Sequence, residues 1–389
     1  MNIFQNTEIA FSHLSDNQIK KSYYLFKTIQ HPHITKIGNS LLNFSIKVHI
    51  PFMRNLIKNT IFEHFCGGET REESLPIIKE LYSRKVYSIL DYSVEGKEEE
   101  KVFDDTCEEI VSIIKFSQHN DAMPFAVFKP TGFGRFSLYE KVNKKEDLTE
   151  IETQEWNKIL QRFEKVANAA YDAGIELMVD AEESWIQDTI DEIVENLMRK
   201  YNQKRCVIFN TLQMYRHDRL QYLKNQYEKA EKEDYYLGFK VVRGAYMEKE
   251  RKRAQKMNYP SPIQKTKIDT DKDYDAAIDF ITDNHHRIML YAGTHNENSC
   301  TLLMSKFQYK NLPKNDSKIW FGQLYGMSDN LSFNLADKGY NVAKYLPYGP
   351  IEEVIPYLTR RATENTSVAG QTGRELQLLS QEIKRRKLS

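Results

Sequence analysis

The stretch NVAKYLPYGPIEEVIPYLTRRATEN, residues 341–365, joins an apolar, strand-like run to an amphipathic helix through a Pro-Tyr-Gly-Pro break. The run reaches Tyr345, and from Ile351 onward apolar residues recur at helical spacing, which predicts one buried helical face. Arg361 follows Leu358 by three residues, so its guanidinium is predicted on or beside that face. A guanidinium that faces inward stays charged and therefore needs an anionic partner.

Two adjacent guanidiniums, those of Arg360 and Arg361, exceed the charge that Glu364 alone could neutralise. A small carboxylate or phosphate ligand would balance the remainder. The alternative interpretation is a solvated helix end, where arginine side chains interact favourably with the helix dipole. These residues by themselves leave both interpretations open.

Bulk composition argues against several classes of protein. The 389 residues carry 55 basic and 55 acidic side chains, so the net charge of zero predicts no affinity for nucleic acid. The cysteines and histidines lack metal-ligand spacing, and no metal site is expected. No signal peptide opens the chain, and no apolar run approaches the roughly 20 residues that span a bilayer. We expect a soluble protein that is at most peripheral on a membrane.

Eight short apolar runs follow one another after residue 85, separated by segments long enough for helices. They begin at Val86, Phe125, Ile175, Cys206, Leu237, Arg287, Ile319 and Asn341. Continuously apolar strands that alternate with helices predict an α/β protein whose parallel sheet closes into a (β/α)8 barrel. An open doubly wound sheet is the alternative, but it usually has fewer strands, and residues 132–134 match only half of its glycine fingerprint.

Residues 1–85 contain helical patterns and no strand-like run, with Ser15 as a plausible helix cap. The apolar segment 41–65 carries scattered basic residues, so it could lie on an anionic membrane. Packing against its own domain is the commoner arrangement for such a helix. We therefore predict two parts, an N-terminal helical arm (1–85) and a barrel domain (86–389).

Barrel enzymes place their active sites at the carboxyl ends of the strands, so the polar residues that end the runs form the candidate site. They are Lys129, Asp180, Gln213, Lys240, Arg243, Gly244, Tyr246, Thr294, His295, Asn296, Gln323 and Tyr345. One such residue alone is more often solvated or ion-paired than catalytic, but seven strand ends on one face favour a site. The excess of cations predicts anionic ligand groups. An organic cofactor with phosphates and a small carboxylate substrate fit best.

Seven motifs together resemble the proline dehydrogenase family, closest to its eukaryotic-type branch. They are DAEES (180–184), QMY (213–215), KVVRGAY (240–246), GTHN (293–296), QLYGM (323–327), YLPYGP (345–350) and YLTRRATEN (357–365). The CGGE, IFEHF and LLNF stretches are similar to that branch's N-terminal arm. The resemblance implies a distorted (β/α)8 barrel that binds FAD non-covalently. It also implies oxidation of L-proline to Δ1-pyrroline-5-carboxylate by hydride transfer to flavin N5, with a membrane quinone as electron acceptor.

The resemblance further assigns roles to individual residues. On the substrate side it implies Lys129, Asp180, Tyr246, Leu324, Tyr345, Arg360 and Arg361. The paired arginines would hold the proline carboxylate with Lys129 beside it, Asp180 would hold the basic residues in place, and the others would line the ring. On the cofactor side it implies Gln213, Lys240, Arg243, Gly244, Thr294, His295, Asn296 and Gln323.

Two features depart from the pattern expected of the family. Some bacterial members carry arginine where this chain has Lys240, and lysine offers a point charge where arginine offers a planar fork. Pro356 lies inside the arginine-bearing helix, where it removes one backbone hydrogen bond and should kink the helix.

We expect the protein in the cytoplasm or on the inner face of a bacterial membrane, or on the matrix side in mitochondria.

Other functions remain open at this point. A hydroxyproline dehydrogenase is the nearest alternative, although the bulk of Tyr345 leaves little room for a 4-hydroxyl group. A non-catalytic barrel that binds a metabolite or a membrane, or a lyase that handles phosphate, would bind no flavin.

Overall fold

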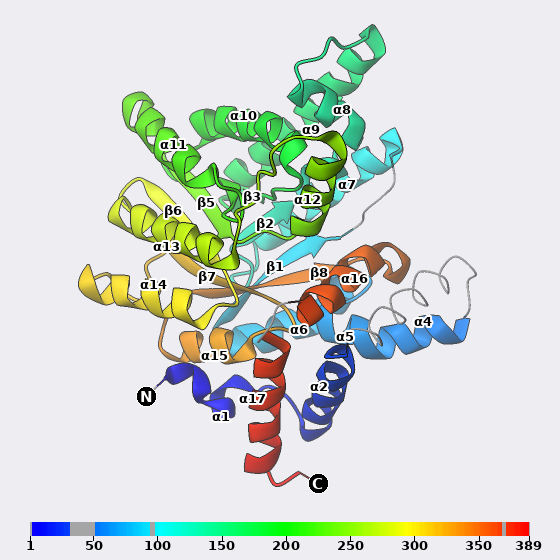
Figure 1. Ribbon diagram of the computed structural model, residues 1–389, viewed down its shortest axis with the longest axis vertical. Coiled ribbons are helices and arrows are strands. Elements are labelled where there is room, and N and C mark those ends of the chain that lie inside the picture. Colours follow the sequence, from blue (N-terminus) through cyan, green and yellow to red (C-terminus); the bar gives the residue numbers. More distant parts are fainter. Residues whose placement is uncertain (1, 32–50, 94–97, 368–370, 389) are drawn as a thin grey trace. The chain divides into compact units, whose positions relative to one another are not determined.

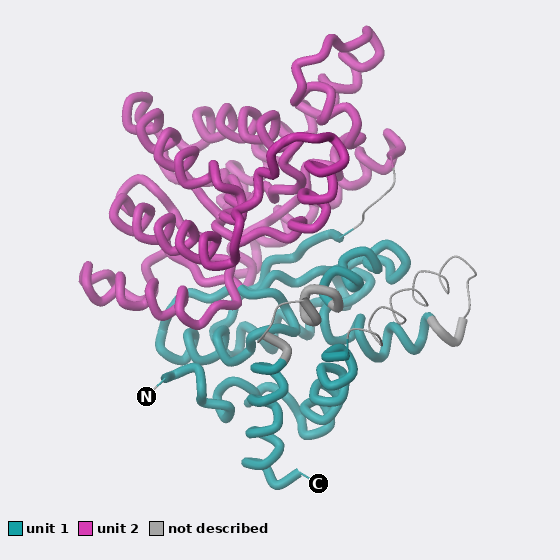
Figure 2. Tube along the Cα trace, in the orientation of Figure 1, with its two compact units in different colours: residues 1–96, 323–389 teal, residues 97–322 magenta. Residues whose placement is uncertain are grey.

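The computed structural model describes residues 2–31, 51–93, 98–367 and 371–388. The LLNF stretch near residue 41 lies outside them, as do the side chains of residues 362–372, among them Glu364. The chain divides into two compact units, shown in Figure 2. Unit 1 comprises residues 1–96 and 323–389, and unit 2 comprises residues 97–322.

Eight parallel strands alternate with helices along the chain (Figure 1). They are β1 (Val86–Tyr92), β2 (Phe125–Phe128), β3 (Glu176–Val179), β4 (Ile208–Gln213), β5 (Leu237–Val242), β6 (Ile288–Gly293), β7 (Ile319–Leu324) and β8 (Val342–Tyr348). Each strand begins at the start of a predicted apolar run or within two residues after it. The predicted (β/α)8 fold class is confirmed.

Unit 2 contains six of these strands in the order β7-β6-β5-β4-β3-β2, with the last two residues of β7 belonging to unit 1. Its helices are α7 (Glu100–Ser117), η3 (Pro130–Gly132), α8 (Phe136–Asn143), α9 (Glu150–Ala173), α10 (Ser184–Tyr201), α11 (Arg219–Glu233), α12 (Met247–Met257), α13 (Lys267–Asp283) and α14 (Glu297–Tyr309). Strands β2 and β4 are buried along their whole length, because both faces of the sheet are covered.

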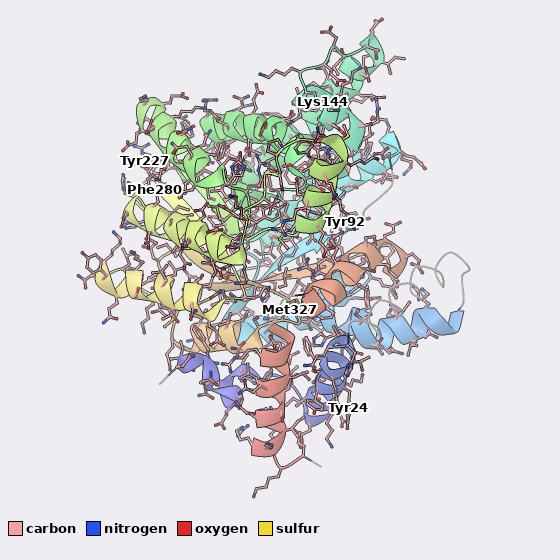
Figure 3. The ribbon with its side chains drawn as sticks, viewed as in Figure 1. Tyr24, Tyr92, Lys144, Tyr227, Phe280 and Met327 are labelled. Carbon is pink, nitrogen blue, oxygen red and sulfur yellow. The ribbon has the colours of Figure 1, made fainter. Side chains whose placement is uncertain are left out.

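Aromatic contacts join neighbouring helices around this sheet. Tyr227 of α11 and Phe280 of α13, labelled in Figure 3, pack edge to face with ring centroids 5.5 Å apart. Such pairs add roughly 0.5–1.5 kcal/mol to the free energy gained from burial. This contact therefore helps to hold α11 against α13.

Unit 1 holds the remaining strands and the helices from both ends of the chain. The helices are η1 (Ile3–Gln5), α1 (Thr7–Ala10), α2 (Asp16–Ile29), α4 (Pro51–Ile57), the π-helical turn η2 (Lys58–Phe62), α5 (Glu63–Phe65), α6 (Arg71–Ser83), α15 (Asp329–Asp337), α16 (Ile351–Ser367) and α17 (Gln371–Arg385). Ser15 caps α2 through a capping box with Gln18, as predicted. Strand β1 pairs with β8, so that Ile89 lies opposite Tyr345.

The N-terminal arm and the C-terminal helices share one hydrophobic core. Phe26 of α2 and Phe65 of α5 belong to the same buried cluster as Ile351 and Leu358 of α16 and Leu379 of α17. The arm is thus packed into unit 1. The division into two domains at residue 85 stays a prediction.

The CGGE segment, by contrast, adds backbone bonds to β8. The N–H of Gly67 donates to the carbonyl of Pro347 over 2.8 Å, and Gly68 forms an isolated parallel bridge with Tyr348.

Across the described ranges, no helix combines the length and the apolarity that crossing a bilayer requires.

Candidate active site

An ion pair in unit 2 joins β5 to the end of β3, the two strands on either side of β4. Lys240, within β5, donates from Nζ to Oδ1 of Asp180, the residue directly after β3, over 2.6 Å. The two side chains are only 9% and 14% exposed. Removing charges from water costs several kcal/mol per ion, so the strands hold this pair in place against a large desolvation penalty. The structure therefore brings together two of the predicted site residues.

A hydrogen-bonded chain links the segments after β2, β3 and β4. Gln213, the last residue of β4, donates from its amide to the carbonyl of Glu182 over 2.7 Å. The Glu182 carboxylate accepts from the N–H and the hydroxyl of Thr131, at 3.0 and 2.8 Å. Burial, together with the charge of Glu183, raises the pKa of Glu182 to about 7. Lys129 lies just before this loop, half-buried, where its charge opposes the rise in that pKa.

Arg243 is held by residues from two helices. Its Nε donates to Asp271 of α13 over 2.6 Å, and its terminal nitrogens donate to Thr294 and Ser299 over 2.7 and 3.0 Å. The guanidinium also lies 4.3 Å from the ring centroid of Tyr274. Arg243 and Thr294, each predicted as a cofactor-binding residue, are thus in direct contact, and these bonds fix the orientation of the guanidinium.

Glycine is required immediately after Arg243. Gly244 has a φ of +120°, and a Cβ at this position would lie 2.6 Å from the ring of Tyr215. Tyr246 follows as the half-buried N-terminal flanking residue of α12. That helix is anchored by the buried carboxylate of Glu250, which accepts from the N–H and the hydroxyl of Ser184, both at 2.6 Å.

The segment after β6 begins a helix. Asn296 caps α14 by accepting from the N–H groups of Asn298 and Ser299, at 2.8 and 3.2 Å. The hydroxyl of Thr294 accepts from the N–H of Asn296 over 3.1 Å, and the half-buried His295 lies between them. A structural role as helix cap therefore accounts for the asparagine side chain.

In unit 1, α16 carries the paired arginines. Its apolar stripe is buried as predicted, with Ile351 at 1% and Leu358 at 0% exposure. Arg361 is 8% exposed and lies 5.2 Å from the ring centroid of Tyr357, so it lies on the buried side. Arg360 is half-buried, and the helix continues through the exposed Pro356. The solvated-end interpretation does not fit Arg361.

The end of β7 lies beside β8 in the same unit. The N–H of Tyr325 donates to the carbonyl of Tyr345 over 2.9 Å. Tyr345 is 7% exposed, Gln323 is 2% exposed and Leu324 is half-buried. The amide oxygen of Gln323 accepts from the Ser332 hydroxyl over 2.9 Å, which fixes its orientation.

Several residues at these places were not predicted. Asp91 is the last residue but one of β1, is 1% exposed and accepts a hydrogen bond from the Ser93 hydroxyl. It carries the same signal as the predicted residues, a polar group that ends an apolar run, and that signal could have found it. Asp271 and Ser299, which hold Arg243, lie on helices and carry no such signal.

The residues of unit 2 suit a flavin dinucleotide in the chemistry of their donors. Gln213, Lys240 and Arg243 present an amide, an ammonium and a guanidinium on the adjacent strands β4 and β5 or directly after them. Phosphates and the polar edge of a flavin ring take hydrogen bonds from such groups. A cofactor of this kind would be held by Gln213, Lys240, Arg243 and the Thr294 segment.

Comparison with known proteins identifies the family. The family model "Proline dehydrogenase" matches residues 75–374. The chain is 37% identical over 351 residues to the carbapenem antibiotics biosynthesis protein CarD of Pectobacterium carotovorum subsp. carotovorum, covering 90% of this chain and 91% of CarD. It is 32% identical over 420 residues to mitochondrial proline dehydrogenase 1 of Dictyostelium discoideum, covering 96% of this chain and 73% of that protein.

Solved structures agree on the fold. Proline utilization A (PutA) from Bdellovibrio bacteriovorus, inactivated by N-propargylglycine, superimposes with a TM-score of 0.79 at 19% identity. The match covers 97% of this chain and 43% of the PutA chain, so this chain spans less than half of that protein. Since the family model matches most of the chain and both relatives exceed 30% identity along it, the chain belongs to the proline dehydrogenase family of enzymes.

Proposed function

We propose that this protein oxidises L-proline to Δ1-pyrroline-5-carboxylate with bound FAD as hydride acceptor, and that a quinone receives the electrons. The observation that carries the proposal is the donor set of unit 2. Lys240 is paired with Asp180 at 2.6 Å, Gln213 ends the neighbouring strand β4, and Arg243 directly follows β5. In a chain of this family, that set supports flavin binding.

The proposed substrate residues act by charge and shape. Arg360 and Arg361 would bind the proline carboxylate, with Lys129 adding positive charge, because guanidiniums match carboxylates in geometry. Tyr345 and Leu324, with Tyr246, would pack on the pyrrolidine ring. Such a grip on both ends of a small substrate serves to hold the reacting atoms about 3–3.5 Å apart.

A deprotonated substrate amine is the second requirement. The nitrogen lone pair of proline must assist departure of the hydride, so the amine has to be neutral. Positive charge around the substrate lowers the pKa of the bound amine and favours that state. A dedicated strong base is therefore unnecessary, and Asp180 or water would accept the proton. FAD, when bound, supplies the hydride acceptor.

The first test is an absorbance scan of the purified protein. We expect a yellow protein whose flavin band bleaches on addition of L-proline. A colourless protein would contradict the proposal and favour a non-catalytic barrel. Comparison of kcat/KM for L-proline and 4-hydroxyproline decides between the two substrates, and we expect proline to be preferred.

The second test addresses the carboxylate grip. Arg361→Met should raise the KM for proline roughly 30-fold or more, because a charge-assisted hydrogen bond contributes about 2–3 kcal/mol. The flavin content should stay that of the wild type. Arg199→Met is the matched control, since Arg199 pairs with Glu195 and Glu233 instead. An unchanged KM in Arg361→Met would remove Arg361 from the grip.

A biosynthetic setting is a second candidate for the same reaction. It is favoured by the similarity to CarD, a protein named for antibiotic biosynthesis, over nearly the whole of both chains. Deletion in the source organism distinguishes the two settings. Loss of growth on proline as sole nitrogen source would support catabolism.

Contact with a membrane is a further part of the proposal. The basic residues Arg54 and Lys58 both donate to Glu69 over 2.6 Å, so the described part of this segment is partly neutralised within unit 1. Co-sedimentation with anionic lipid vesicles, and activity with a short-chain quinone, would test attachment and acceptor separately.

A further inference from the structure

A buried charge pair lies under the turn that follows β7, and the proposed chemistry does not use it. Lys344 of β8 has 1% of its side chain exposed, and its Nζ lies 2.7 Å from Oδ1 of Asp329, the first residue of α15. Burial favours the neutral acid, but the lysine charge and His13 hold the pKa of Asp329 well below its usual range. Burying an ion pair is rarely a net gain in stability, so a further role for Lys344 is worth testing.

The ammonium does more than neutralise the carboxylate. It also donates to the carbonyl of Met327 over 2.8 Å, and it lies 3.4 Å from the carbonyl of Leu324. Met327 is labelled in Figure 3. Within the described part of the chain, the three polar contacts of the Lys344 ammonium fall within the six residues from Leu324 to Asp329.

The turn does not adopt its shape by local preference alone. Gly326 has a φ of +74° and Ser328 a φ of +51°, and the left-handed conformation is strained for a residue other than glycine. A Cβ on Gly326 would lie 2.2 Å from the carbonyl oxygen of His64. Tertiary bonds hold the turn instead. The Ser328 N–H donates to Glu375 of α17 over 2.6 Å, and the His64 ring bonds the Gly326 carbonyl over 2.9 Å.

Strand geometry connects this turn to the proposed substrate residues. Successive side chains of a strand point to opposite faces, so Lys344 and Tyr345 face opposite ways from β8. The backbone carbonyl of Tyr345 accepts from the N–H of Tyr325, and the side-chain ammonium of Lys344 donates to the carbonyl of Met327. The turn is thus fastened to β8 at two residues that follow Leu324.

We propose that Lys344 is a positioning residue, which sets Leu324 and Tyr345 relative to each other so that both can pack on the substrate ring. This inference rests on the proposed function of those two residues. Lys344 does not touch the substrate in this scheme. Its effect reaches the reaction through the backbone of the turn.

The test is Lys344→Met, which keeps the length of the side chain and removes its charge and donors. We expect the KM for L-proline to rise roughly tenfold, because a small displacement of a pocket is costly, while kcat changes less. The Kd for cyclopentanecarboxylate, read from the flavin absorbance band, should rise by the same factor. Lys338→Met is the matched control, since Lys338 is 45% exposed and pairs with Asp337 at the surface.

A second variant keeps the test decisive if Lys344→Met fails to fold. Lys344→Met/Asp329→Asn removes both charges and so leaves no unpaired carboxylate. A lower Tm with unchanged KM and Kd in either folded variant would show a structural role only and would overturn the inference. If the wild-type flavin does not bleach with proline, the proposed function itself fails, and the role of Lys344 falls with it.

Discussion

Lys240 shows how one residue combines burial, charge and a fixed partner. Its ammonium has three donors, and Asp180 accepts one of them over 2.6 Å. Lysine is a compact point charge, so its effect on a flavin depends on distance more than on the planar geometry that arginine imposes. We therefore expect substitution of this lysine to change the absorbance and reduction potential of the flavin more than the affinity for proline.

The prediction is that Lys240→Ala shifts the flavin absorbance band and reduction potential, while the KM for proline stays within about threefold. The physical reason is that a positive charge beside the flavin stabilises its reduced, electron-rich state, and the substitution removes this charge. Spectra and a redox titration measure both effects. Because the substitution leaves Asp180 buried without its lysine, Lys240→Ala/Asp180→Asn serves as the control. Unaltered spectra in both variants would place Lys240 away from the flavin.

At the scale of elements, the loop between β5 and α12 depends on one backbone conformation. Arg243 is tied to α13 and α14, while Glu250 ties α12 to the start of α10. Gly244 joins these two fixed parts with a φ of +120°. A loop anchored at both ends cannot relax to accept a side chain at its centre.

Gly244→Ala should therefore lower the free energy of unfolding by more than about 2 kcal/mol, through left-handed strain and collision with Tyr215. We also expect weaker retention of FAD. Gly339→Ala is the control, because Gly339 has a φ of +87° but a Cβ there meets nothing within 4 Å. Chemical denaturation of both variants separates strain from collision. Equal losses would mean that the Tyr215 ring can move aside.

At the scale of the whole molecule, buried carboxyls link stability to pH. Burial raises the pKa of Glu176, Glu182 and Glu375 to about 7 each, above the ordinary value of about 4.3. Between these values the unfolded chain binds fewer protons than the folded protein. The contribution of these three groups to stability is therefore complete below pH 4 and is lost as the pH rises through 7.

We predict that the free energy of unfolding falls between pH 5 and 7.5, with each such group adding a slope of at most about 1.4 kcal/mol per pH unit. Glu176→Gln should reduce that slope, because the amide does not ionise. Urea denaturation at several pH values measures it. Asp329 does not cancel the effect, since its lowered pKa places its own contribution at acidic pH. Burial lowers the pKa of His64, so this one group opposes the fall, while three carboxyls produce it. A rise of stability over this range would contradict the prediction.

Sequence periodicity determined the elements. The eight strands, the buried stripe of α16 and the cap at Ser15 depend on the spacing of apolar residues or on one local hydrogen bond. The buried side of Arg361 followed from the same spacing, because a helix repeats every 3.6 residues. The roles of the site residues came from resemblance to a family, and they stay predictions.

Only the tertiary structure decided which partners the charged side chains meet. Lys240 pairs with Asp180 across 60 residues of sequence, Arg243 with Ser299 across 56, and Ser328 with Glu375 across 47. No local pattern predicts such pairs, since a buried ion takes whichever partner the packed backbone brings within about 3 Å. The sequence by itself therefore determined where strands and helices form, while the folded chain alone determined the partners that neutralise its buried charges.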